Sequence, residues 1–282
     1  ADPDGGDLSW SYDGERIDIC WAAPVDVGVK RRVRVRYTVS DPLTGLMFSW
    51  PDAANPGAPR LAASDHETER ARHWIPCVDH PSVRTTLDLR IRTDAAWTAL
   101  ANGRLDGTED HDDGTRTTRW LLDERCPAYL LCIAVGDWRR VEAGEGGGVS
   151  VELYGPQTFS DDDLRRSFGK TASMLDWMTR KLGSPFPFPK YFQFAFPGIG
   201  GAMENISLVS WDDRWLADER FAAERGWLID LINVHEMAHS WFGDAVVCRD
   251  FAHVWLKESW ATYMESCWLQ DTDGEAAMQM QL

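Results

Sequence analysis

The sequence lacks long apolar runs, an excess of positive charge and closely spaced cysteine pairs. No apolar stretch approaches the roughly 18 residues that span a bilayer, so we expect no transmembrane segment in this chain. Lysine and arginine number 29 against 45 aspartates and glutamates, which leaves a net charge of −16. Nucleic acids and anionic membrane surfaces are bound by clustered lysine and arginine, so this balance argues against both as partners.

The six cysteines form no Cys-x-x-Cys pair. We expect mostly buried free thiols, although the spacing also allows a Cys126–Cys132 disulfide. No positively charged and then apolar leader is present, which favours the cytoplasm unless the start of the protein is missing. A length of 282 residues with 44% hydrophobic composition permits one large or two medium domains. These features say nothing about the oligomeric state.

Alternation of apolar and polar residues predicts strands in the first half of the chain. Val29 to Tyr37 alternates apolar residues with arginines and predicts a half-buried strand with a basic outer face. Asn-Gly and Asp-Gly turn signals separate the further predicted strands. These strands cover residues 85–92, 97–107, 115–122 and 130–135. The glycine run from Gly144 to Gly148 indicates a domain boundary or the tip of a hairpin.

Helical patterns appear after about residue 149. Asp161 to Leu182 predicts one long helix, with Ser160 as its N-cap and Gly183 directly after it. Strands are predicted at 191–196 and 206–211, and the apolar run 227–234 predicts a buried helix that ends near Gly243. The chain is therefore expected to be α+β, with a β-rich domain at residues 1–148 and an α/β domain at residues 149–282.

His235-Glu236-Met237-Ala238-His239 carries the clearest chemical signal. Residues four apart lie on one face of a helix, so two imidazoles can meet at one Zn²⁺. Glu236 is rotated away from that face and can act as a general base without binding the metal. Eighteen residues separate His239 from Glu258, enough for a turn and a second helix that returns with a third ligand.

Two histidines and one glutamate form the three-ligand set of a catalytic zinc site, which leaves one position open. The His-Glu-x-x-His pattern also arises by chance on amphipathic helices. Polar residues in an apolar helix are unfavourable without a partner, however, and a metal supplies one. Glu265 lies two turns beyond Glu258 and is a candidate to orient one of the histidines.

Three motifs in the chain resemble those of the gluzincin zinc aminopeptidases, the family of membrane alanyl aminopeptidase and leukotriene hydrolase. Residues 201–205 read GAMEN, residues 235–244 read HEMAHSWFGD, and residues 255–261 read WLKESWA, similar to the family's WLNEGFA. Weaker similarity extends from about Glu15 to Glu265. The resemblance implies a β-saddle N-terminal domain followed by a thermolysin-like catalytic domain, both incomplete in this chain.

The resemblance also implies a zinc-dependent aminopeptidase that acts on peptides with a free amino terminus. One Zn²⁺ per chain would be held by His235, His239 and Glu258, with Glu236 as the catalytic base. Glu204 would bind the α-ammonium of the substrate, and counting back from the Pro76-Cys77 pair places Glu67 beside it. The implied substrate-binding residues are Glu67, Gly200, Gly201, Ala202, Met203, Glu204 and Asn205. A solvated acidic loop at Glu67 and a plain glycine-rich turn at residues 200–202 remain the alternatives.

Two departures from the family pattern bear on activity. Lys257 and Ser259 replace the usual Asn and Gly beside Glu258, and we expect them to tune the site without abolishing it. The tyrosine that stabilises the oxyanion in relatives lies beyond the end of this sequence, and Tyr263 is not its equivalent. We therefore expect this chain alone to bind zinc but to turn over slowly. The alternatives are an enzyme that also hydrolyses an epoxide, an endopeptidase, and a non-catalytic interaction protein.

Overall fold

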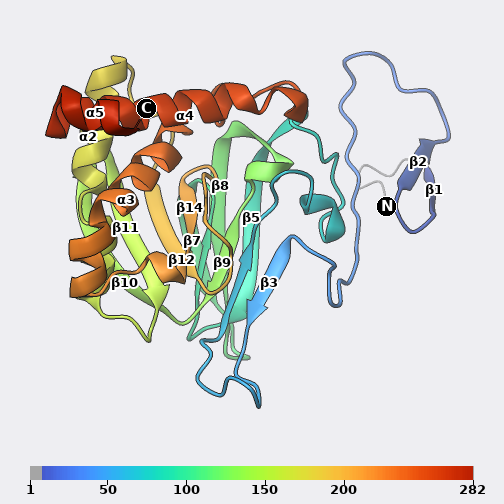
Figure 1. Cartoon of the computed structure of the whole chain (residues 1–282). Coiled ribbons are helices and arrows are strands. Elements are labelled where there is room, and N and C mark those ends of the chain that lie inside the picture. The colour runs from blue at the N-terminus through green and yellow to red at the C-terminus, as the bar shows by residue number, and fades with distance from the viewer. Residues whose placement is uncertain (1–7, 282) are drawn as a thin grey trace.

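Strands dominate the first half of the chain and helices the second half in the computed structural model, which describes residues 8–281. The predicted α+β class is therefore confirmed. Figure 1 shows the helices gathered on one side of the molecule and the N-terminal strands on the other, with the β1–β2 hairpin standing apart. Among residues 8–281, no helix combines the length and the apolar character that crossing a bilayer requires.

Three sheets belong to the described part of the N-terminal half. A two-stranded sheet pairs β1 (Leu8–Tyr12) with β2 (Ile17–Trp21). A four-stranded sheet has the order β3 (Leu46–Ser49), β4 (Leu61–Ser64), β9 (Ile133–Gly136), β6 (Thr98–Ala101). A three-stranded sheet has the order β5 (Arg84–Asp94), β8 (Thr115–Pro127), β7 (Arg104–Asp110).

A five-stranded mixed sheet forms the centre of the second half. Its order is β10 (Trp138–Gly146), β11 (Val149–Pro156), β12 (Tyr191–Phe196), β14 (Leu208–Asp212), β13 (Ala202–Met203). The central pairs, β11 with β12 and β12 with β14, are parallel, and the outer pairs are antiparallel. Parallel neighbours need a crossover connection, and two helices supply it between β11 and β12.

Within residues 8–281, five α-helices follow or connect these strands. They are α1 (Asp161–Phe168), α2 (Thr171–Leu182), α3 (Glu219–Ala238), α4 (Trp255–Asp273) and α5 (Glu275–Gln281). Short 3₁₀ turns lie at η1 (Ala71–His73), η2 (Ala128–Leu130), η3 (Asp213–Trp215) and η4 (Phe251–His253). Helices α1 and α2 pack on β10, and α4 packs on α3.

Strand β12 is buried on both faces, which explains its continuous apolar sequence. Tyr191 and Ala195 belong to the core shared with the helices, whereas Phe192, Phe194 and Phe196 belong to a second core. The second core includes Leu61, Leu100 and Trp120 from the N-terminal sheets. The five-stranded sheet therefore lies between the helices and the N-terminal strands.

Residues 29–37 do not form the predicted strand. Within the described chain they pair with no other strand, and Val33, Val35 and Tyr37 are exposed. Alternation produces a stable strand only where a neighbouring strand satisfies the backbone and a second layer covers the apolar face. Neither is present here, so the pattern alone was insufficient.

The predicted helix 161–182 is two helices, because Gly169 and Lys170 interrupt it. The Gly169 amide still bonds to Arg165 at 2.8 Å, and the Thr171 hydroxyl donates to the carbonyl of Phe168 at 2.7 Å. Glycine has a low helix propensity, which makes it a natural site for the interruption. The predicted start is correct: Ser160 forms a capping box with Asp163, and Gly183 follows the last turn.

The other strand predictions hold with shifted limits. The predicted strand 97–107 is divided by the Asn102-Gly103 turn into β6 and β7, and the first residue of 130–135 lies in η2. Gly147 and Gly148 form the hairpin turn between β10 and β11. These two strands are neighbours in one sheet, and the division of the chain at residue 148 stays a prediction. All six cysteines are free thiols.

Asn102 joins the two halves next to the glycine-rich segment of the predicted site. Its side-chain amide donates to the carbonyls of Leu130 at 2.9 Å and Ile206 at 2.7 Å, and its oxygen accepts from the Cys132 amide at 2.6 Å. The Gly103 amide donates to the Ser207 hydroxyl at 2.8 Å. Because these groups are buried and fully bonded, they hold the chain after residue 205 against the N-terminal sheets.

Candidate functional site

Helix α3 presents two imidazoles one turn apart at its C-terminal end. Asp218 caps its start by accepting a hydrogen bond from the Phe221 amide at 2.7 Å. His235 lies in the last turn, and His239 is the C-cap residue. The helix therefore ends at Ala238, earlier than the predicted stop near Gly243, and Trp227 is 57% exposed where the sequence predicted burial.

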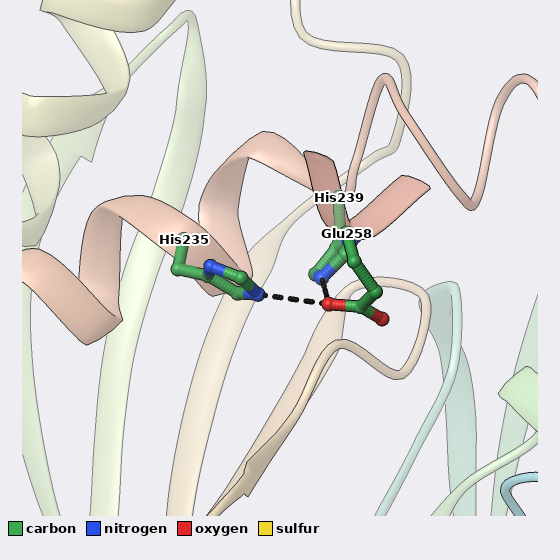
Figure 2. Close-up of side chains that lie close together, drawn as sticks. All are labelled: His235, His239 and Glu258. Carbon is green, nitrogen blue, oxygen red and sulfur yellow. Dashed lines mark hydrogen bonds and ion pairs between the residues drawn. The ribbon is translucent and has the colours of Figure 1, made fainter. Parts of the chain in front are cut away.

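The predicted metal ligands meet in space. Glu258 lies in the first turn of α4, and its Oε2 is 3.2 Å from His235 Nε2 and 3.5 Å from His239 Nε2. One ligand atom from each of the three residues lies within 4.8 Å of the others. Figure 2 shows both rings directed at this carboxylate oxygen, although the side chains come from two different helices.

Both histidines are oriented through their other ring nitrogen. His235 Nδ1 lies 2.6 Å from Glu265 Oε1, and His239 Nδ1 lies 3.0 Å from the carbonyl oxygen of Phe242. A carboxylate and a carbonyl both accept hydrogen bonds, so each Nδ1 carries a proton and each Nε2 is the atom that faces Glu258. Glu265 thus makes the contact that its spacing in the sequence predicted.

The donor atoms suit a divalent cation such as zinc. Two imidazole nitrogens and one carboxylate oxygen are typical ligands of a catalytic zinc ion, and no fourth protein ligand is required. Burial opposes the charged form of His235, but hydrogen bonds to Glu258 and Glu265 raise the pKa of its imidazole to about 10. The carboxylates around the rings therefore favour positive charge at this point, which a bound cation would supply.

Glu236 lies beside the ligand cluster without contacting His235 or His239 through a hydrogen bond. Its side chain is buried, and its Oε2 atom has no hydrogen-bond partner among the described residues. Buried polar atoms without partners are uncommon, and a catalytic role or a bound water or ion is among the explanations for them. Burial first and the charge of Glu204 second raise the pKa of Glu236 to about 7.

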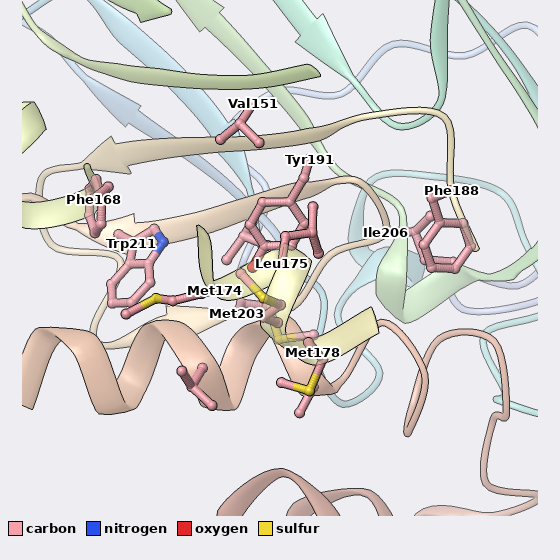
Figure 3. Packing of buried hydrophobic residues seen from close by; sticks show 14 of the residues in the cluster. Val151, Phe168, Met174, Leu175, Met178, Phe188, Tyr191, Met203, Ile206 and Trp211 are labelled. Atoms are coloured by element: carbon pink, nitrogen blue, oxygen red, sulfur yellow. The ribbon is translucent and has the colours of Figure 1, made fainter. Parts of the chain in front are cut away.

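The core beneath the sheet fixes the position of these elements. Met174, Leu175 and Met178 of α2 pack between the sheet and α3, together with Tyr191 and Trp211 from the strands (Figure 3). All five side chains are fully buried. Interiors packed at this density leave little room for a helix to shift, so α3 holds its two histidines at a constant distance from the sheet.

Five of the seven predicted substrate-binding residues line one small cavity of about 220 Å³. They are Glu67, Gly200, Gly201, Ala202 and Met203. Gly200 and Gly201 have φ angles of +82° and +114°, conformations that residues with a side chain rarely adopt. Asp65 and Arg70 also line this cavity, and the sequence did not single them out.

Glu204 and Asn205 are not among the residues that line this cavity. The Asn205 amide donates to the Ser210 hydroxyl at 3.2 Å, and its side chain is fully buried, so it packs within the sheet. Glu204 is also buried, and its Oε1 lies 3.9 Å from His239 Nδ1. One oxygen each of Glu67, Glu204 and Glu258 lies within 4.8 Å of the others. The acidic positions that the sequence placed in separate segments therefore form one group.

Lys257 stands at the centre of this acidic group, where the sequence predicted only an indirect effect. Its Nζ lies 2.5 Å from Glu204 Oε1, 2.6 Å from Glu258 Oε1 and 2.9 Å from Glu67 Oε1. Burial opposes its charge, but Glu204 and then Glu67 raise the pKa of Lys257 above its ordinary value. A lysine next to a predicted metal ligand was the signal in the sequence that could have identified it.

A larger cavity of about 460 Å³ lies away from this group, between the N-terminal strands and the outer face of the five-stranded sheet. Trp97, Trp120 and Phe192 line it together with arginines. Arg116 and Arg140, two of those arginines, are paired with Asp110 and Glu152. We assign the functional site to the smaller cavity, since Glu67 in its lining belongs to the acidic group next to the histidines.

Models of two domains of one peptidase family match this chain. The peptidase M1 N-terminal domain matches residues 11–130, and the peptidase family M1 domain matches residues 166–282. The second match includes all three ligand candidates and Glu236.

Individual proteins that are similar to this chain are named aminopeptidases. Aminopeptidase N of Lactobacillus delbrueckii subsp. lactis is 30% identical over 210 residues, which cover 73% of this chain and 24% of the relative. Puromycin-sensitive aminopeptidase of Caenorhabditis elegans is 29% identical over 209 residues, 73% of this chain and 22% of the relative. Aminopeptidase N of Lactobacillus helveticus is 26% identical over 268 residues, 91% of this chain and 32% of the relative. The chain spans about a quarter of the length of these relatives.

Proposed function

The chain belongs to peptidase family M1, and from this we propose that it takes part in the zinc-dependent removal of amino-terminal residues from peptides. The relatives that it matches are named aminopeptidases, which supports a peptidase. The observation that carries the proposal is the meeting of His235, His239 and Glu258 beside a buried Glu236 whose Oε2 has no partner among the described residues.

His235, His239 and Glu258 would hold the metal. When bound, zinc acts as a Lewis acid that polarises a peptide carbonyl and makes water a better nucleophile at neutral pH. Glu265 and the Phe242 carbonyl keep both imidazoles in the orientation that directs Nε2 toward this position. The ligand geometry is therefore set by hydrogen bonds before any substrate arrives.

Glu236 would accept a proton from the attacking water and return it to the leaving amine. A general base must be within hydrogen-bond reach of that water and must not be engaged elsewhere. The unpartnered Oε2 of Glu236 supports this role. Glu236 follows His235 directly in the chain, which keeps it beside the ligand cluster.

Glu204 and Glu67 would bind the amino terminus of the substrate, which makes cleavage proceed from the chain end. Strand β13 is the last strand in the order of its sheet, and Gly200 and Gly201 directly before it carry no side chains. An extended peptide can add to such an edge through backbone hydrogen bonds. Slow turnover by this chain alone stays a prediction.

Hydrolysis of a panel of aminoacyl anilides by the purified, zinc-loaded protein tests the proposal. Alanyl, leucyl, arginyl and glutamyl anilides should be cleaved, whereas their N-acetylated forms should be cleaved at least tenfold more slowly if the free amine is recognised. Glu236→Gln should lower kcat by about 10²- to 10⁴-fold. This variant keeps all three ligands, so its zinc content should equal that of the wild type.

An active Glu236→Gln variant would contradict the role of the base. A wild-type protein that binds zinc but cleaves neither the free nor the acetylated panel would instead favour a non-catalytic protein that reuses the fold. Cleavage of internal bonds in a blocked peptide would indicate an endopeptidase.

A further inference from the structure

The ammonium group of Lys257 is surrounded by carboxylates. Glu67, Glu204 and Glu258 each place one oxygen within 2.9 Å of its Nζ. The ammonium donates hydrogen bonds to Glu204 and Glu258, and Glu67 completes the group as an ion pair. The side chain is only 2% exposed, and charges buried to this degree persist only when they are paired in this way.

Two of these partners are the residues that would bind the substrate. In the proposed function, Glu67 and Glu204 receive the α-ammonium of a peptide. An α-ammonium and a lysine ε-ammonium have the same charge and the same three donors, so they compete for the same carboxylate oxygens. In this structure both oxygens that would receive the substrate already bind the chain's own lysine.

We propose that Lys257 is a specificity-determining residue that occupies the α-ammonium position with its own ammonium and so competes with free amino termini. The inference rests on the proposed function, because it takes the roles of Glu67 and Glu204 from it. Replacement of Lys257 should then tighten the binding of free amino termini and so increase the discrimination against acylated ones that Glu67 and Glu204 provide.

The turn at Gly243 lies close to the side chain of Lys257. Gly243 has a φ of +142°, and a Cβ atom there would lie 3.3 Å from Lys257 Cδ and 3.3 Å from His239 Nδ1. The lysine stem therefore passes close to the turn that follows α3, and the absence of a side chain at residue 243 allows this approach. Two features thus favour the observed position of the Lys257 ammonium. The carboxylates bind the ammonium, and the turn at Gly243 leaves space for the aliphatic part of the side chain.

A simpler explanation is that Lys257 only neutralises surplus negative charge. Under that explanation its removal would destabilise the fold but would not create a site for a free amine. The competition proposed here predicts the opposite for ligands, because removal would leave Glu67 and Glu204 unpaired and available. Binding of small amines therefore separates the two explanations.

Titration calorimetry with leucinamide and N-acetyl-leucinamide on the metal-free protein makes this test independent of catalysis. Lys257→Met keeps the length of the side chain and removes the ammonium, and Lys257→Asn is a second variant in case the first does not fold. Leucinamide should bind at least tenfold more tightly to either variant than to the wild type, whereas N-acetyl-leucinamide should bind all three proteins equally. Lys181→Met is the matched control, since it removes a lysine paired with Asp271 outside the site and should change neither affinity.

Equal affinity of leucinamide for the wild type and for a folded Lys257 variant would overturn the inference, including the case in which none of them binds it. An equal gain for the acetylated ligand would also overturn it. Activity assays of the zinc-loaded proteins test the proposed function independently of this binding experiment. Cleavage of leucyl anilide by the wild type, abolished by Glu236→Gln, supports the proposed function even if leucinamide affinity does not change.

Discussion

The two histidines of the site differ in what holds their Nδ1 atoms. His239 relies on a backbone carbonyl that no substitution can remove, whereas His235 relies on the carboxylate of Glu265. Outer partners of this kind fix the ring orientation and raise the basicity of the ligand. The contribution of Glu265 can therefore be measured by substitution.

Glu265→Gln should weaken zinc binding by about 10- to 100-fold, because an amide is a poorer acceptor than a carboxylate and orients His235 less firmly. Competition with a chromogenic chelator measures the affinity. Glu224→Gln is a suitable control, since Glu224 lies on the exposed side of α3 and pairs with Arg220. Equal zinc affinity in the Glu265→Gln variant and the wild type would show that the contact has no effect on the metal site.

Residue counting located Glu67, but it did not identify Lys257. The spacing to the Pro76-Cys77 pair led to the carboxylate that lies within ion-pair distance of Lys257. Lys257 was noted only as a neighbour of a ligand. Consecutive residues on a helix point about 100° apart, so the sequence indicated that Lys257 flanks Glu258 without binding the metal. The sequence did not indicate which residues Lys257 would contact.

At the level of elements, the segment from Asp65 to Trp74 carries Glu67 from the N-terminal half to the site. Trp74 Nε1 donates to His66 Nε2 at 2.7 Å, and both rings also pack against each other. This hydrogen bond requires Nε2 of His66 to be unprotonated. Burial lowers the pKa of His66 from 6.5 to about 4.

The stability of the protein should therefore fall as the pH drops from about 6.5 to 4. In this range the unfolded chain protonates His66 while the folded chain does not, so acid favours unfolding; above pH 6.5 both states are neutral and the effect vanishes. A shift of this size corresponds to at most about 3 kcal/mol. Urea unfolding of the wild type and of His66→Gln at pH 7 and pH 4.5 measures it, and the variant should lose less stability. Equal losses would assign the pH dependence to other groups.

Other segments show which sequence patterns were sufficient to predict secondary structure. The capping box at Ser160 and the glycine after Leu182 act within a few residues, and both limits were predicted correctly. The strand at 29–37 depends on a partner strand elsewhere in the chain, and the described structure provides none. Local signals therefore predicted the helix ends, whereas pairing decided which alternating segments became strands.

At the scale of the whole molecule, the candidate metal site joins two helices that are separate in the chain. His235 and His239 come from α3 and Glu258 comes from α4, so a bound cation would link the two. A ligand that binds only the folded state stabilises it, by about 2.7 kcal/mol at a hundred times its Kd. Metal binding should therefore be visible in the melting temperature as well as in activity.

Chelation of the metal should lower the Tm by several degrees, since about 1 kcal/mol corresponds to roughly 2–4 °C in a protein of this size. Differential scanning calorimetry of the zinc-loaded protein, the chelated protein and the reloaded protein measures the change. Glu236→Gln should show the same loss on chelation because Glu236 is not a ligand. A Tm that is unaffected by chelation and reloading would mean that no cation links α3 and α4.

The sequence by itself determined the parts of this protein that depend on regular spacing. A spacing of four positions from His235 to His239 places both rings on one face of any helix, and the alternation at 85–92 produces a strand wherever a partner is available. The GAMEN segment, the histidine pair and Glu258 were recognisable as a set because all three resemble motifs of one peptidase family.

Only the tertiary structure decided what lies opposite each of these groups. Glu67, Glu204 and Lys257 are far apart in the chain, and the contact between them depends on how the N-terminal strands, the central sheet and α4 pack together. Charge–charge interactions act through space and fall with distance, so their partners are set by packing and not by order along the chain. The contacts of Lys257 with the acidic group are therefore determined by the tertiary structure.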